Sequence, residues 1–78
     1  MDWRNNITSD KGILGGKPVI KGTRLSIEFL LGLFAAGWSQ ERVLKNYPNL
    51  TTADLLALFA YAQQNVDEVT TFELKNSV

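Results

Sequence analysis

One helix-start pattern occurs three times in this 78-residue chain and constrains its fold more than any other feature. Each copy has an apolar residue, then a Ser or Thr, then a second apolar residue five positions after the first. The hydroxyl oxygen can accept a hydrogen bond from an amide of the first helical turn, and the two apolar residues clasp that turn. The copies are Leu25-Ser26 with Leu30, Trp38-Ser39 with Val43, and Leu50-Thr51 with Leu55. Three helices are therefore predicted.

The predicted helix ends agree with these starts. Gly37 suits the left-handed residue that closes a helix. Pro48 disfavours a helical conformation at Tyr47 and ends the second helix. Asn65 closes the third helix, whose start is strengthened by Asp54 at the capping-box position. The helices are expected near residues 27–36, 40–46 and 52–64.

The regions before and after the helices are less regular. Residues 1–25 alternate short apolar pieces with turn formers, which predicts a small extended or hairpin element; the turn formers are Gly12, Gly15, Gly16, Pro18 and Gly22. Residues 66–78 allow a short strand, an extension of the third helix, or disorder. The expected organisation is one domain, made of an N-terminal β/turn segment (1–25), a three-helix unit (26–65) and a C-terminal tail (66–78).

Several strings of residues resemble the bacterial family catalogued as domain of unknown function 433. The longest runs from Gly12-Ile13-Leu14-Gly15-Gly16-Lys17-Pro18 to Gly22-Thr23-Arg24-Leu25. Shorter ones follow in the same order at Ala36-Gly37-Trp38-Ser39, Asn46-Tyr47-Pro48 and Leu50-Thr51. The resemblance covers roughly residues 7–62.

The resemblance implies a fold and a role. The implied fold is mainly α, a three-helix homeodomain-like bundle of the helix-turn-helix type with a short N-terminal β element. The implied role is that of an antitoxin-like partner of a nuclease-like toxin of the PIN class. Members of the family usually continue as a charged helix after the third one, whereas this chain reads Gln63-Gln64-Asn65-Val66-Asp67-Glu68 and then β-favouring residues.

The composition argues against an enzyme. The chain has no Cys and no His, so the commonest nucleophiles, bases and transition-metal ligands are missing. Gly16-Lys17 invites comparison with a phosphate loop, but Lys11 stands where that loop needs Gly, and Pro18 where it needs Ser or Thr. No catalytic, metal or cofactor site is expected.

No targeting or membrane segment is recognised either. The N-terminal residues lack the apolar run of a signal peptide. The longest apolar stretch, residues 27–38, is far shorter than the roughly 20 residues that span a bilayer. We expect a cytoplasmic protein without membrane contact.

Charge is unevenly distributed along a chain whose net charge is zero. Residues 1–45 carry a net +3 and residues 46–78 a net −3. The cations that could face DNA all lie in the first part: Lys17, Lys21, Arg24, Arg42 and Lys45. An internal role competes for two of them, because Arg24 could pair with Glu28 and Lys45 with Glu41.

The third predicted helix is poorly suited to reading DNA. A helix-turn-helix protein would place Arg, Lys, Asn or Gln of this helix against base edges. Residues 54–62 contain no cation and one anion, and only Gln63 and Gln64 at the far end could address a base.

Both the first and the third predicted helix are apolar over most of their circumference, more than so small a domain can bury. The residues outside the expected core stripes are candidates for a protein interface: Phe29, Leu33, Leu56, Ala60 and Tyr61. The alternative is a fuller core, with the N-terminal segment lying over these helices. The leading hypothesis is a protein-binding, antitoxin-like module that uses these apolar helix faces. We also expect the chain to form a homodimer. The runner-up is a dimeric DNA-binding regulator that uses the basic N-terminal loop and the second helix.

Overall fold

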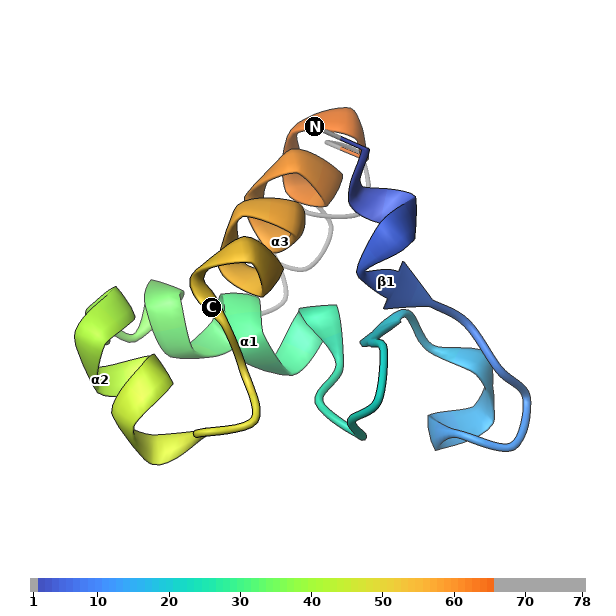
Figure 1. Ribbon diagram of the computed structural model, residues 1–78, viewed down its shortest axis with the longest axis horizontal. Helices are drawn as coiled ribbons and strands as arrows, with labels where there is room; N and C mark the ends of the chain where they lie inside the picture. The colour runs from blue at the N-terminus through green and yellow to red at the C-terminus, as the bar shows by residue number, and fades with distance from the viewer. Residues whose placement is uncertain (1, 66–78) are drawn as a thin grey trace, which may run out of the picture.

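The computed structural model describes residues 2–65 of the chain (Figure 1). A 3-10 helix η1 (Trp3–Asn5) precedes strand β1 (Ile7–Thr8), and a second 3-10 helix η2 (Leu14–Gly16) precedes strand β2 (Val19–Ile20). The helices α1 (Ile27–Ala35), α2 (Gln40–Asn46) and α3 (Thr52–Gln64) follow. The predicted fold class, mainly α with three helices and a short N-terminal β element, is confirmed. The alternatives for residues 66–78 lie outside the described residues.

All three helices begin at the predicted caps. The hydroxyl of Ser26 accepts a hydrogen bond from the Phe29 amide at 3.0 Å, and Ser39 caps α2 in the same way. At α3 the capping box is complete. Thr51 Oγ1 accepts from the Asp54 amide at 3.1 Å, and Asp54 Oδ2 accepts from the Thr51 amide at 3.0 Å. These local bonds fix the start of each helix.

The helix ends also follow the predicted signals. Gly37 has φ 94°, and its amide donates to the Phe34 carbonyl while the Trp38 amide donates to the Leu33 carbonyl. This is the Schellman arrangement that needs a left-handed residue after the helix. Helix α2 ends at Asn46, because Tyr47 before Pro48 is not helical, with φ −125° and ψ 76°. Asn65 caps α3.

Strand β2 joins the N-terminal segment to the helices. It pairs antiparallel with β1, with Ile7 opposite Ile20 and Thr8 opposite Val19. A further bridge links Val19 to Ser26, and the Ile27 amide donates to the Pro18 carbonyl at 3.0 Å. The sheet therefore holds the chain directly before α1.

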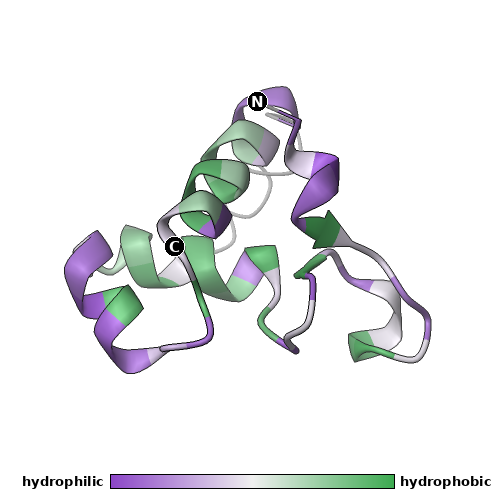
Figure 2. Cartoon of the chain, in the orientation of Figure 1, coloured by the Kyte–Doolittle hydropathy of each residue, from purple (hydrophilic) through white to green (hydrophobic). Residues whose placement is uncertain are grey.

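The core takes side chains from both strands and all three helices. Figure 2 shows α1 and α3 largely apolar and α2 largely polar, which agrees with Val43 being the one buried residue of α2. The cluster of buried residues consists of Ile7, Ile20, Ile27, Leu30, Val43, Leu50, Leu55, Ala57, Leu58 and Tyr61. In the described part of the chain, no helix is long and apolar enough to cross a membrane.

Candidate functional site

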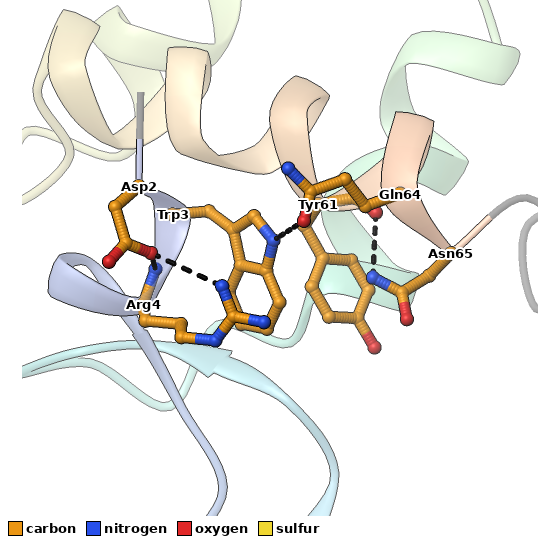
Figure 3. Close-up of polar contacts among 6 residues, drawn as sticks. All are labelled: Asp2, Trp3, Arg4, Tyr61, Gln64 and Asn65. Carbon is orange, nitrogen blue, oxygen red and sulfur yellow. Dashed lines mark hydrogen bonds and ion pairs between the residues drawn. The ribbon is translucent and has the colours of Figure 1, made fainter.

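The N-terminal segment lies along one side of α3 (Figure 1). Near the start of α3, Asn6 Nδ2 donates a hydrogen bond to Asp54 Oδ1 at 3.0 Å. Near its end, Trp3 Nε1 donates to Gln64 Oε1 at 2.8 Å. Between these points the Trp3 ring meets the Tyr61 ring edge-on, with centroids 4.9 Å apart (Figure 3). This side of α3 is therefore covered by the chain's own first residues.

The prediction that Tyr61 belongs to an open interface is wrong. Its side chain is only 8% exposed and belongs to the core cluster. The physical reason is the indole of Trp3, which packs on the Tyr61 ring from the other end of the chain. For this residue, the alternative in which the N-terminal segment lies over the helix holds.

The opposite side of α3 is open and uncharged. Leu56 is 56% exposed, the largest exposed fraction among the exposed large hydrophobic residues of the described chain. The residues at helical spacing around it are exposed or half-buried, and together they form what we call the outer face of α3: Thr52, Ala53, Leu56, Phe59, Ala60 and Gln63. Asp54, the one charged residue of α3, is engaged in the capping box and with Asn6. The outer face thus offers apolar contacts and no ionic ones.

Helix α1 continues this apolar surface at one point. The rings of Phe34 and Phe59 lie 5.2 Å apart at a tilt of 58°. Both side chains are half-buried and pack against the core. The predicted interface residue Leu33 is half-buried as well.

Phe29 is exposed in a different setting. It is 44% exposed, and its ring stands edge-on to the ring of Tyr47 at 5.9 Å. Tyr47 follows α2, so Phe29 marks the surface near the α2–α3 connection. Four of the five predicted interface residues are therefore at least partly accessible: Phe29, Leu33, Leu56 and Ala60.

The five candidate DNA-facing cations have different surroundings. Lys17 Nζ lies 3.3 Å from Glu28 Oε2, in an exposed ion pair. The guanidinium of Arg42 stacks over the Trp38 ring at 3.7 Å. Within residues 2–65, Lys21, Arg24 and Lys45 make no ion pair, so the expected pairs of Arg24 with Glu28 and of Lys45 with Glu41 are not formed.

A surface hollow, which we call the loop hollow, lies between two segments far apart in the sequence. Residues 22–25 line one side, residues 46–49 the other, and Ile13 completes it. Arg24 is the one charged residue of the lining. The sequence pointed to Arg24 but not to the residues that line the opposite side of the hollow, Asn46, Tyr47 and Asn49. Both sides of the hollow lie in strings that carry the family resemblance, Gly22-Thr23-Arg24 and Asn46-Tyr47-Pro48. The sequence did not indicate that these two strings come together.

The acidic side chains of the described residues do not cluster. In the part of the chain that the structure describes, no three Asp or Glu side chains gather as a metal site would require. The accessible features include the apolar outer face of α3, the exposed Phe29, the loop hollow with Arg24, and the exposed cations Lys21 and Lys45.

Comparison with known proteins gives consistent results. The family model described as "Protein of unknown function (DUF433)" matches residues 7–62. "Uncharacterized protein y4eO" from Sinorhizobium fredii is 39% identical over 62 residues, which cover 80% of this chain and only 28% of that longer protein. The crystal structure of a DUF433 member protein from Anabaena variabilis matches with a TM-score of 0.80 and 32% identity, over 87% of this chain and 67% of that one.

Proposed function

The chain thus belongs to the DUF433 family, whose description names no activity, and we propose that it is a protein-binding module that works through the outer face of α3. The observation that carries the proposal is Leu56, 56% exposed in the middle of an uncharged helix face. An exposed apolar side chain among further apolar residues is typical of a surface that another protein covers. The proposed partner, on the family resemblance, is a nuclease-like toxin of the PIN class, which makes this chain antitoxin-like.

The charge of α3 supports a protein partner over DNA. Binding to DNA draws much of its free energy from cations that neutralise phosphates. Helix α3 has no cation, and its single anion, Asp54, is held in the capping box. A helix of this kind would meet a phosphate backbone without a favourable ionic contact, whereas an apolar groove on a protein would bury Leu56.

The proposal has three further parts. The chain acts by binding and has no catalytic activity of its own. It works in the cytoplasm, where a nuclease toxin of the same cell would be held inactive. A second copy of the chain is able to occupy the same apolar face, so we also propose a homodimer in the absence of the partner.

A DNA-binding regulator is the second candidate. The observation that favours it is the unpaired state of Lys21, Arg24 and Lys45 within residues 2–65. Lys21 and Arg24 stand in the loop between β2 and α1, and Lys45 lies in the last turn of α2. These residues, and not α3, would contact the phosphates.

Affinity purification at two salt concentrations separates the two candidates. The tagged chain is incubated with lysate of its own host at low and at high salt, and bound proteins are identified by mass spectrometry. The protein-binding proposal predicts that a PIN-class nuclease is retained at both concentrations, because apolar contacts respond little to salt. The regulator predicts DNA that is released at high salt, since the affinity falls steeply with salt for each phosphate contacted. If the tagged chain retains neither a nuclease nor any other specific protein, the first proposal is contradicted.

A further inference from the structure

The wall of the loop hollow that carries Arg24 is held in one conformation. The Thr23 hydroxyl donates to the Ile20 carbonyl at 2.8 Å and accepts from the Leu25 amide at 3.0 Å. The preceding Gly22 has φ 79°, a left-handed conformation that a side chain would strain. Because Thr23 and Leu25 are fixed, the backbone of Arg24 between them has little freedom.

The facing wall is held as firmly. The Tyr47 amide donates to the Val43 carbonyl at 2.9 Å, and the Leu50 amide donates to the Tyr47 carbonyl at 2.9 Å. Asn46 Nδ2 donates to the Arg42 carbonyl at 2.8 Å. The Tyr47 ring forms a T-shaped contact with the Phe29 ring, with centroids 5.9 Å apart. The hollow is therefore a preformed feature of the surface, and binding there would require little ordering.

The lining combines one free cation with apolar side chains. Arg24 makes no ion pair or hydrogen bond within residues 2–65, and Glu28, the nearest acid in sequence, is engaged by Lys17. No carboxylate belongs to the lining, whereas Ile13, Leu25 and Tyr47 contribute apolar surface. A guanidinium is a planar fork of donors that matches a carboxylate, often through two parallel hydrogen bonds.

We propose that the loop hollow binds a carboxylate-bearing peptide segment of a partner protein, in which an apolar residue stands beside an Asp or Glu. Arg24 pairs with the carboxylate, and the apolar neighbour lies against Leu25 and Tyr47. The apolar lining and the single cation favour this ligand over a nucleic-acid backbone, whose recognition depends on several cations acting together. The inference rests on the proposed function only in that the segment belongs to a protein partner.

An NMR titration of the isotope-labelled 78-residue chain tests this site. The probe is an acetylated, amidated pentapeptide with the sequence Ala-Leu-Asp-Leu-Ala, and the matched control peptide has Asn in place of Asp. We expect the amide signals of residues 22–25 and 46–49 to shift with the Asp peptide. Loss of a charged hydrogen-bonding pair corresponds to roughly tenfold weaker binding, which we expect for the Asn peptide.

Two variants locate the effect. Arg24→Gln should weaken binding of the Asp peptide by about tenfold, whereas Lys21→Gln, which removes a neighbouring exposed cation outside the lining, should leave it unchanged. An unaltered spectrum elsewhere shows that each variant is folded. Four results would each overturn the proposal. The amide signals do not shift, both peptides shift them equally, or Arg24→Gln binds the Asp peptide as tightly as the unaltered chain does. The fourth is that a short DNA duplex shifts these amide signals more strongly than the Asp peptide does.

The titration and the lysate purification fail independently. The titration uses only the purified chain and synthetic peptides, so a negative result there leaves a captured nuclease standing and removes only the assignment of the hollow. Conversely, specific peptide binding at the hollow would stand even if no nuclease were captured through α3.

Discussion

The two sides of α3 differ in what covers them, although each carries a large side chain with apolar surface, Tyr61 on one side and Leu56 on the other. On one side Trp3 and Asn6 reach Tyr61, Gln64 and Asp54, so the chain's first residues form a cover. On the other side Leu56 is exposed and no described segment of the chain covers it. The difference shows that an apolar helix surface is not by itself an interface, because the same chain can provide its own cover. Of these two sides of α3, the outer face is the one that no described segment covers.

The largest expected effect comes from two neighbouring leucines of α3, one in the core and one on the outer face. Leu55 is 1% exposed and Leu56 is 56% exposed. Leu55→Ala should lower the free energy of unfolding by about 3 kcal/mol, because it leaves a cavity in the core. Leu56→Ala should change it by less than about 0.5 kcal/mol, since Ala is a good helix former and little burial is lost. Urea unfolding of both variants measures the difference, and similar losses would mean that Leu56 is covered.

The cover over Tyr61 should account for the next largest effect. Trp3→Ala removes the ring contact with Tyr61 and the hydrogen bond to Gln64, and we expect a loss of about 2 kcal/mol. Trp3→Phe keeps an aromatic ring and loses only the indole N–H, so it should cost about 1 kcal/mol. Tyrosine fluorescence and urea unfolding follow both changes. Full stability of Trp3→Ala would show that the N-terminal segment does not form the cover.

The smallest expected effect concerns the charges beside Trp3. Arg4 lies 3.5 Å from Asp2 and 4.6 Å above the Trp3 ring, in an exposed position. Because exposed ion pairs contribute little, Arg4→Ala should lower the free energy of unfolding by less than about 1 kcal/mol. Thermal unfolding at low and high salt measures this contribution. A loss as large as that of Trp3→Ala would mean that the charges, and not the indole, hold the cover in place.

Local signals predicted the helices well. The caps at Ser26, Ser39 and Thr51 place all three helix starts, and Gly37 and Pro48 place two ends, with α1 one residue shorter than expected. Each signal acts within a few residues, through a side chain that bonds to a nearby amide or a backbone angle that only certain residues adopt. Such interactions can be read from the sequence without knowing the fold.

Long-range contacts were beyond the reach of the same reasoning. The contact of Trp3 with Gln64 joins residues 61 positions apart, and nothing local to Tyr61 indicates that an indole covers it. The loop hollow likewise forms only when residues 22–25 and 46–49 come together. The candidate site was therefore predicted residue by residue, and its division into a covered side, an open face and a hollow came from the structure.

The most direct test of the open face compares two exposed leucines in the affinity purification. Leu56→Glu places a charge on the outer face of α3 and keeps a good helix former. Leu14→Asp places the same charge on η2, where Leu14 is 45% exposed with φ 50°, a conformation that Asp tolerates. We predict that Leu56→Glu no longer retains the partner nuclease, whereas Leu14→Asp retains it as the unaltered chain does. Retention by Leu56→Glu, or loss by Leu14→Asp alone, would contradict a partner surface on α3.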